Sequence, residues 1–149
     1  MKKYCKVVSI SLFLVLLLSA CRYENGPFIS LYSPEKRLIN TWTIQKVFRN
    51  EVATSNPEYL ANQLGTYYGF HAYGTLVVNC YYEGTFRESY TGSWRFFDNY
   101  KKIEIQFLLL DVSYKYTAKI KKLSRSELEY EYTDDNGVKW RLIMYAQPR

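Results

Sequence analysis

The sequence predicts an all-β domain, an antiparallel up-and-down barrel of about eight strands with one short helix, and two observations carry this prediction. Over most of residues 37–149, apolar and polar side chains alternate with a period of two, which is the pattern of half-buried strands. Turn residues separate the alternating runs at short intervals. Antiparallel strands in series must hide their edges, and closure into a barrel removes them; a sandwich of two sheets is the alternative.

The expected elements follow one another along the chain. The first strand contains Trp42, Ile44 and Phe48 on one face, and Asn56-Pro57 then opens the single expected helix, which ends near Gly65. The later strands are expected at residues 66–71, 75–82, 85–90, 93–97, 102–109, 114–120, 128–132 and 138–145. A chain of this length suits one domain.

The first 20 residues have the parts of a signal peptide. A start with three lysines precedes an apolar run, residues 7–18, and Leu18-Ser19-Ala20 stand directly before Cys21. The run is too short to cross about 30 Å of hydrocarbon as a helix. The segment resembles a type II lipoprotein signal, which implies cleavage before Cys21 and lipidation of that cysteine. An uncleaved membrane anchor and a buried core helix are the alternatives.

Residues 21–36 are expected to form the lipidated N-terminus and a tether, and residues 37–149 form the barrel domain. Asn25-Gly26-Pro27 punctuates the tether, which has no sustained periodicity. Acyl chains on Cys21 attach the protein to a membrane. No aspartate of the inner-membrane type follows the cysteine, and Glu24 is the one acid close behind it. We therefore expect the outer membrane, facing the periplasm, with surface exposure as the alternative.

The charge pattern argues against a nucleic-acid partner. The formal net charge is +6, but three lysines and no acids lie in the signal, so the remaining chain carries +3. Basic and acidic residues alternate along most segments instead of forming a basic stripe. The densest basic patch, residues 119–125, precedes Glu127, Glu129 and Glu131, which predicts a hairpin whose two sides carry complementary charges.

Residue types for catalysis or metal binding are scarce. His71 is the one histidine, so we expect no His-rich metal site and no Ser-His-Asp triad, and a structural or surface role for this residue. Asp134-Asp135-Asn136 lacks the spaced ligands of a calcium loop and is interpreted as a hairpin turn. Cys5 leaves with the signal and Cys21 is expected to be lipidated, so Cys80 is left alone. For Cys80, a small buried hydrophobe is favoured over a reactive thiol. We expect no enzyme and no cofactor.

Four motifs stand at strand edges and turns: Leu38-Ile39-Asn40-Thr41-Trp42-Thr43-Ile44, Gly69-Phe70-His71-Ala72-Tyr73-Gly74-Thr75-Leu76, Gly92-Ser93-Trp94-Arg95-Phe96, and Ile120-Lys121-Lys122-Leu123-Ser124 with Glu127-Leu128. On these motifs, residues 36–146 resemble the lipocalin-like domains of Bacteroidetes lipoproteins. The resemblance implies that Trp42 closes the barrel floor, as the tryptophan of the lipocalin Gly-x-Trp motif does under an arginine of the last strand. Arg141 is the matching arginine, and Asn40 replaces the glycine.

Aromatic residues are unusually frequent: they make up 18% of the chain, and 16 of them are tyrosines. Strand propensity alone accounts for many of them. Adjacent tyrosines on a strand, such as Tyr67 and Tyr68 or Tyr81 and Tyr82, point to opposite faces and do not all fit one core.

Two hypotheses for function remain open. In the first, the barrel binds a small apolar or amphipathic ligand; the expected lining residues are Phe107, Tyr114, Tyr116, Tyr130 and Trp140. In the second, the barrel is filled, and exposed aromatic side chains contact a protein or glycan partner in the cell envelope.

Overall fold

The computed structural model describes residues 23–25, 30–54, 66–82, 84–109 and 112–148 of the protein. The elements are α2 (Pro34–Leu38), β1 (Asn40–Arg49), β2 (Val52–Ala53), β3 (Thr66–Phe70), the 3-10 turn η1 (Ala72–Gly74), β4 (Thr75–Tyr82), β5 (Thr85–Phe97), β6 (Lys102–Leu109), β7 (Val112–Leu123), β8 (Glu127–Thr133) and β9 (Lys139–Ala146). The signal peptide and the helix expected after Asn56 lie outside the described residues.

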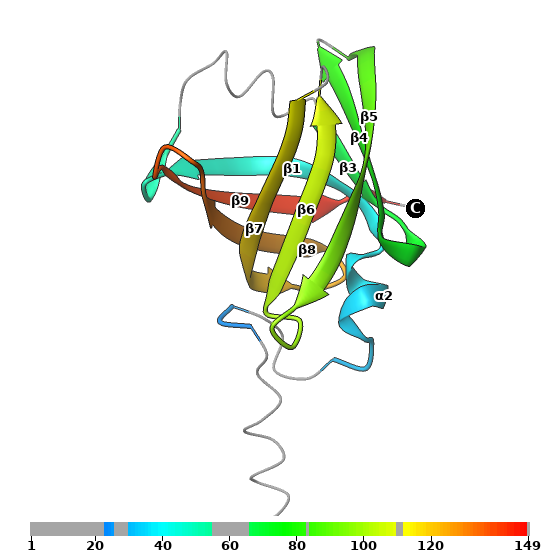
Figure 1. The fold of residues 1–149 in the computed structure, drawn as a ribbon. Coiled ribbons are helices and arrows are strands. Elements are labelled where there is room, and N and C mark those ends of the chain that lie inside the picture. The colour runs from blue at the N-terminus through cyan, green and yellow to red at the C-terminus, as the bar shows by residue number, and fades with distance from the viewer. Residues whose placement is uncertain (1–22, 26–29, 55–65, 83, 110–111, 149) are drawn as a thin grey trace, which may run out of the picture.

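The strands form one antiparallel sheet that closes on itself. The order is β2-β1-β3-β4-β5-β6-β7-β8-β9, and β1 also pairs with β9. Eight strands, β1 and β3 to β9, therefore make a barrel (Figure 1). The short β2 pairs with the end of β1, on the edge that β3 occupies at the other end. The predicted fold class, an antiparallel eight-stranded barrel, is confirmed, and the two-sheet sandwich is not the fold.

Strand β5 differs from the expectation, because the two strands predicted at 85–90 and 93–97 are one continuous strand. Gly92 lies in its middle, opposite Leu76 on β4 and Phe107 on β6. A Cβ atom at Gly92 would lie 2.1 Å from the carbonyl oxygen of Gln106 and 2.7 Å from the Cβ of Phe107. The glycine therefore allows a close approach between two paired strands and does not mark a turn.

Helix α2 closes one end of the barrel, and it begins in the segment predicted to be a tether. Ser33 caps the helix by accepting a hydrogen bond from the Lys36 amide at 3.4 Å, and Pro34 occupies the first turn. Arg37 is buried and donates from Nη1 to the Leu123 carbonyl at 2.7 Å. Leu38 is fully buried and accepts a 2.8 Å hydrogen bond from Trp42 Nε1. We call this end of the barrel the closed end.

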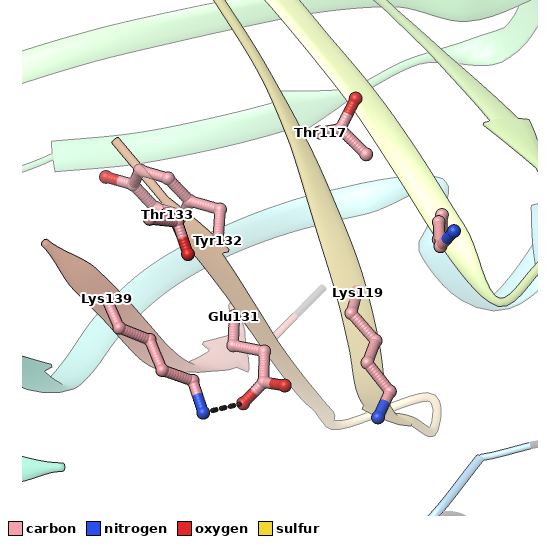
Figure 2. Close-up of a pocket in the computed structure, with 7 residues that line it drawn as sticks. Thr117, Lys119, Glu131, Tyr132, Thr133 and Lys139 are labelled. Atoms are coloured by element: carbon pink, nitrogen blue, oxygen red, sulfur yellow. Dashed lines mark ion pairs between the residues drawn. The ribbon is translucent and has the colours of Figure 1, made fainter. Parts of the chain in front are cut away.

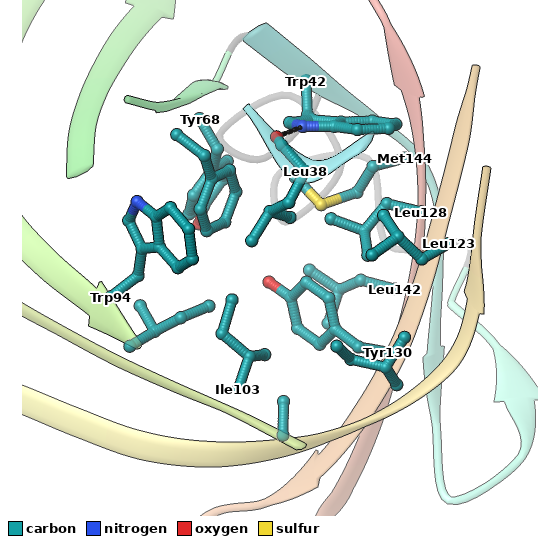
Figure 3. Close-up of a cluster of buried hydrophobic side chains, with 14 of the residues drawn as sticks. Leu38, Trp42, Tyr68, Trp94, Ile103, Leu123, Leu128, Tyr130, Leu142 and Met144 are labelled. Atoms are coloured by element: carbon teal, nitrogen blue, oxygen red, sulfur yellow. Dashed lines mark hydrogen bonds between the residues drawn. The ribbon is translucent and has the colours of Figure 1, made fainter. Parts of the chain in front are cut away.

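The interior at the closed end is packed with aliphatic side chains around Trp42 (Figure 3). Inward positions of five strands supply most of them, as period-two alternation requires. The fully buried members include Trp42, Ile44, Ile103, Ile105, Leu123, Leu128 and Met144, together with Leu38 from α2. Because these residues are fully buried, they do not line an accessible cavity. We call this part of the interior the closed half.

Strands β7 and β8 pair over only part of their lengths. Their register runs from Lys119 opposite Glu131 to Leu123 opposite Leu128, with a bulge between Ile120 and Lys122. The predicted charge-complementary hairpin is confirmed, since Lys121 and Glu131 lie 3.8 Å apart. Beyond this register β7 pairs with β6 alone, so the barrel wall is split between β7 and β8 on the side away from the closed end.

Among the described residues, no helix has the length and apolar character needed to cross a bilayer.

Candidate functional site

The candidate site is the interior on the other side of the barrel, which we call the open half. Its side chains continue the inward faces of the strands that build the closed half. On β6 and β7 the register pairs Phe107 with Tyr114, and on β8 and β9 it pairs Tyr132 with Trp140. The five residues predicted to line a ligand site lie on these inward faces: Phe107, Tyr114, Tyr116, Tyr130 and Trp140.

Three tyrosines form a cluster at the centre of the interior. The rings of Tyr116 and Tyr132 are stacked with centroids 4.3 Å apart, and the hydroxyl oxygens of Tyr116 and Tyr130 lie 3.2 Å apart. Burial, with Tyr130 and Tyr68 nearby, raises the pKa of Tyr116 well above its ordinary value. The hydroxyl of Tyr116 therefore stays neutral at physiological pH, and it can donate or accept a hydrogen bond in an aromatic environment.

Exposure rises steadily from the closed half to the open half. Ile105 and Met144 are fully buried, whereas Phe107 and Trp140 are half-buried although they also face inward. Tyr114, on the same face as Tyr116, is 44% exposed. Inward-facing aromatic rings therefore remain accessible to solvent at this end of the barrel. The open half therefore offers an accessible aromatic surface inside the barrel, which the closed half does not.

The β8–β9 turn holds Trp140 at the rim of the open half. Trp140 Nε1 donates to Asp134 Oδ2 at 2.8 Å, and the Arg49 guanidinium lies 5.9 Å from the ring centroid. The hydrogen bond from Trp140, followed by those from the Val138 and Asn136 amides, lowers the pKa of Asp134. The predicted hairpin turn is thus present, and Asp134 organises it. In the described part of the chain, no group of His, Cys, Asp and Glu side chains is suited to hold a metal ion.

A shallow groove of about 310 Å³ lies along the split in the wall (Figure 2). Tyr132 belongs both to this groove and to the tyrosine cluster, so the groove borders the cluster. Lys139 Nζ and Glu131 Oε2 form an ion pair of 3.2 Å across its floor. The other lining residues are Lys102, Thr117, Lys119 and Thr133.

The predicted pairing of Trp42 with Arg141 is wrong. The register places Trp42 opposite Ala146 and Arg141 opposite Phe48, on the outer face of the barrel. There the Arg141 guanidinium lies 4.0 Å from the Phe48 ring centroid and 3.2 Å from Glu129 Oε1. Trp42 does form the floor, but Leu38 of the helix covers it. The buried arginine at this end is Arg37.

The other residues considered for chemistry, His71 and Cys80, contact neighbouring parts of the barrel. His71 is exposed, and its backbone carbonyl accepts a hydrogen bond from Trp94 Nε1 at 3.1 Å. Cys80 is free and half-buried on the inward face of β4, where Thr66 Oγ1 donates to its sulfur at 3.9 Å. Burial raises the pKa of the Cys80 thiol, which suits a small hydrophobe better than a nucleophile. Cys21 lies outside the described residues.

Sequence reasoning missed two members of the site, Tyr68 and Tyr132. Tyr68 is buried on β3, and Tyr67 beside it faces outward, where its ring lies 5.1 Å from that of Tyr81. The prediction that adjacent tyrosines face opposite ways is confirmed for this pair. The signal for Tyr132 was present in the sequence, because Tyr130 and Tyr132 are two residues apart on one strand and share a face.

Comparisons with known proteins support the fold. No protein family model matches the chain, and no curated protein matches it in sequence. A lipocalin-like protein from Bacteroides uniformis superposes with a TM-score of 0.54 at 15% identity, covering 74% of this chain and 99% of that one. An uncharacterized protein from Bacteroides eggerthii gives a TM-score of 0.55 at 11% identity with the same coverage. Bovine odorant binding protein with its natural ligand gives 0.44 at 16% identity, covering 80% and 77%. The chain has the fold of a lipocalin-like domain of the Bacteroidetes type.

Proposed function

We propose that this protein is a membrane-anchored lipoprotein whose lipocalin-like barrel binds one small apolar or amphipathic ligand in its open half. It acts as a binding protein and not as an enzyme. Its lipid on Cys21 attaches it to the cell envelope, at the outer membrane and facing the periplasm. The signal peptide pattern of residues 1–21 supports the anchoring, and the residues after Cys21, which include no aspartate next to it, support the outer membrane.

The observation that carries the ligand proposal is the accessible aromatic lining of the open half. In the closed half the inward side chains are fully buried, as Ile105 and Met144 are. In the open half the inward-facing rings of Phe107, Tyr114 and Trp140 remain partly accessible. A ligand that covers them gains free energy at about 25 cal/mol per Å² of apolar surface removed from water. The hydroxyls of Tyr116 and Tyr130 suit a ligand with one polar group.

Fluorescent dye binding tests the proposal directly. The dye N-phenyl-1-naphthylamine emits strongly only in apolar surroundings, so titrating it against the folded protein measures an accessible apolar interior. Tyr114→Ala removes a ring that is 44% exposed, so folding survives and dye binding falls several-fold. Tyr67→Ala is the matched control, because it removes a tyrosine from the outer face, and it leaves dye binding unchanged.

No dye binding by the wild-type protein, or equal binding by both variants, contradicts a ligand site in the open half. Native mass spectrometry of protein purified gently from its host then identifies the natural ligand, because a bound mass that is absent from the Tyr114→Ala protein belongs to this site.

One observation favours a second function, contact with an envelope protein or glycan. Three rings form an edge-to-face row on the outer face of β3, β4 and β5: Tyr67 and Tyr81 have centroids 5.1 Å apart, and Tyr81 and Phe86 have centroids 5.6 Å apart. Phe86 is 53% exposed. Under this function the outer-face variant Tyr67→Ala loses partner binding while dye binding is absent in the wild type.

A further inference from the structure

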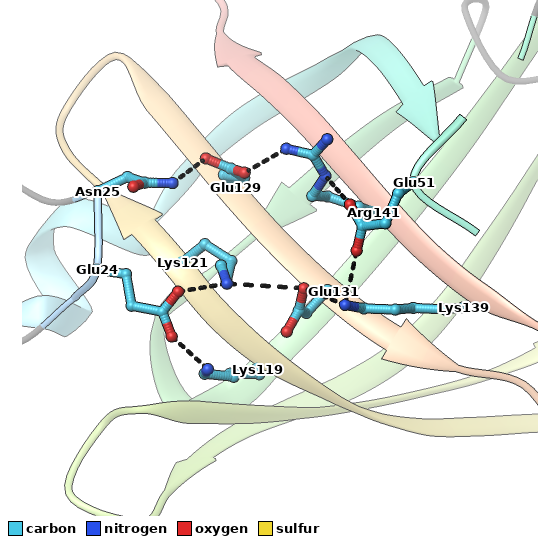
Figure 4. Close-up of polar contacts among 9 residues, drawn as sticks. All are labelled: Glu24, Asn25, Glu51, Lys119, Lys121, Glu129, Glu131, Lys139 and Arg141. Atoms are coloured by element: carbon cyan, nitrogen blue, oxygen red, sulfur yellow. Dashed lines mark hydrogen bonds and ion pairs between the residues drawn. The ribbon is translucent and has the colours of Figure 1, made fainter. Parts of the chain in front are cut away.

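Three residues ahead of the barrel are docked on it. Tyr23 is 4% exposed, with the Arg37 guanidinium of α2 5.6 Å from its ring centroid. Glu24 forms ion pairs with both Lys119 and Lys121 on β7 (Figure 4). This segment, Tyr23 to Asn25, is therefore fixed by a buried ring and two ion pairs, although its sequence predicts a tether.

Asn25 adds two hydrogen bonds to the same docking. Its amide N–H donates to the Lys121 carbonyl at 2.8 Å, and its side-chain Nδ2 donates to Glu129 Oε2 at 3.1 Å. The backbone bond extends the segment along β7, and the side-chain bond reaches β8. Together with Glu24, these contacts fix both the position and the direction of the chain at the closed end (Figure 4).

The docked segment fixes where a lipid on Cys21 can be. One residue, Arg22, separates Cys21 from Tyr23. Consecutive Cα atoms are about 3.8 Å apart, so two such steps place the Cα of Cys21 within about 7.6 Å of that of Tyr23. Tyr23 itself packs against α2, the helix that covers the barrel floor. Acyl chains attached at Cys21 therefore start beside the closed end, and a long flexible tether does not intervene.

The surface of the closed end carries the side chains that a bilayer interface favours. Leu31 is 97% exposed, Tyr32 is 46% exposed, and the Arg125 guanidinium lies 4.8 Å from the Tyr32 ring centroid. Exposed leucine and tyrosine gain free energy at a bilayer surface, and arginine interacts there with lipid phosphates. In Figure 1, α2, the β5–β6 turn and residues 23–25 lie together at this end of the barrel.

The β5–β6 turn contributes to the same surface. Phe97 is 37% exposed, and with Phe96 and Tyr100 it lines a groove of about 390 Å³ that Glu35 of α2 borders. Lys101 beside it is exposed, as is Lys36 on α2. The closed end thus combines accessible aromatic side chains with exposed cations.

We propose that the closed end of the barrel is a membrane-facing surface, held against the bilayer by the docked segment Tyr23–Asn25. The inference rests on the lipidation of Cys21 under the proposed function and goes beyond it, because it assigns an orientation. The acyl chains supply the membrane affinity, and the docked segment keeps the closed end close enough for Leu31, Tyr32 and Phe97 to contact lipid. The open half then faces the aqueous compartment, where ligands arrive.

Lysine footprinting on vesicles tests the orientation. The full-length protein is produced in a bacterial host, its lipid is confirmed by intact mass, and it is reconstituted into vesicles of phosphatidylethanolamine and phosphatidylglycerol. A water-soluble acylating reagent labels accessible lysines, and peptide mass spectrometry measures each site. Lys36 and Lys101 at the closed end are expected to label several-fold less than Lys46 and Lys115 on the barrel wall, although all four are exposed in the free protein.

Two charge-reversal variants isolate the docked segment. Glu24→Lys places a cation against Lys119 and Lys121, so the segment detaches and the labelling of Lys36 and Lys101 rises to that of the wall lysines. Glu51→Lys is the matched control, because Glu51 also contacts two cations, Lys139 and Arg141. It lies in the β1–β2 turn, away from the closed end, and leaves the shielding intact.

Each of the other possible results of the labelling experiment contradicts one part of the proposal. Equal labelling of all four lysines in the lipidated wild-type protein overturns the orientation, because the barrel then swings freely. Shielding that survives Glu24→Lys overturns the role of the docked segment. A mass without lipid on Cys21 overturns the anchoring and this inference together, whereas dye binding tests the ligand proposal separately.

Discussion

The two halves of the barrel interior share the same strands but differ in what their side chains do. Along β6, Ile103 and Ile105 of the closed half are followed by Phe107 in the open half, and along β9 the buried Met144 contrasts with the half-buried Trp140. Compact aliphatic packing gives stability at one end, and accessible aromatic surface at the other end leaves room for binding. A single period-two pattern thus encodes a structural region and a candidate binding region on the same strand.

The largest expected effect comes from a matched pair of tryptophans, one in each half. Trp42→Ala removes a fully buried ring and its hydrogen bond to Leu38, and such changes cost about 3–5 kcal/mol. Trp140→Ala removes a half-buried ring and costs clearly less, while it weakens dye binding. Urea denaturation of both variants measures the difference in the free energy of unfolding. Equal losses would show that the open half is packed as tightly as the closed half.

A second prediction concerns Gly92, where the two halves meet. Gly92→Ala forces a Cβ atom against the Gln106 carbonyl and the Phe107 side chain, so β5 and β6 must separate. Overpacking of this kind costs about 1–3 kcal/mol. Ser93→Ala, one residue later on the exposed face, is the control and stays within about 0.5 kcal/mol. The midpoint of thermal unfolding compares them, and a Gly92→Ala protein as stable as the control would contradict the close approach.

The tyrosine cluster gives a smaller, pH-dependent effect. Because burial raises the pKa of Tyr116, the folded protein retains a proton that the unfolded chain loses near pH 10. The contribution to stability is fully present below about pH 10 and is lost as the pH rises toward the folded pKa. Tyr116→Phe removes this loss of stability at alkaline pH. At neutral pH it lowers the free energy of unfolding by about 1 kcal/mol, because the contact with the Tyr130 hydroxyl is lost.

Measurements of the free energy of unfolding between neutral and alkaline pH check both claims. The wild-type protein is expected to lose stability with rising pH more steeply than Tyr116→Phe. Identical slopes in the two proteins would mean that the Tyr116 hydroxyl is accessible to water, and the polar group of a ligand would then find no preorganised partner there.

Much of the barrel was readable from the sequence, because alternation reports directly on strands. The strands at residues 75–82 and 102–109 have the predicted bounds, and Phe107 and Tyr114 lie on the predicted face. The break predicted at Gly92 failed because glycine serves two purposes, a turn or a close approach, and only the neighbouring strand decides between them. Helix α2 has five residues, too few for a helical period, although Ser33-Pro34 is a capping signal.

The errors in the candidate site have different causes. Trp140 and Arg141 are adjacent on one strand and cannot both face inward, so alternation alone excluded Arg141 as the partner of Trp42. The docking of Glu24 was not readable, since it depends on cations almost a hundred positions later in the chain. Contacts of this kind need the tertiary structure.

The smallest expected effect concerns this docked segment and compares the two ends of the barrel once more. Hydrogen bonds from Lys119 and Lys121 lower the pKa of Glu24 from its usual 4.5 to about 2. Since the folded pKa is depressed, the docking contribution is present above the unfolded value and is lost as the pH falls through the folded one.

An NMR titration of the side-chain carboxyl carbons measures this pKa and its dependence on salt. Glu24 is expected to titrate at lower pH than a free glutamate, and added salt moves its midpoint upward, because exposed ion pairs are screened. Glu51, whose pKa is lowered chiefly by Lys139, is the comparison at the open end. A Glu24 midpoint at the ordinary value, with Glu51 still depressed, would mean that the segment leaves β7 in solution. The closed end would then lose the contact that positions it toward the membrane.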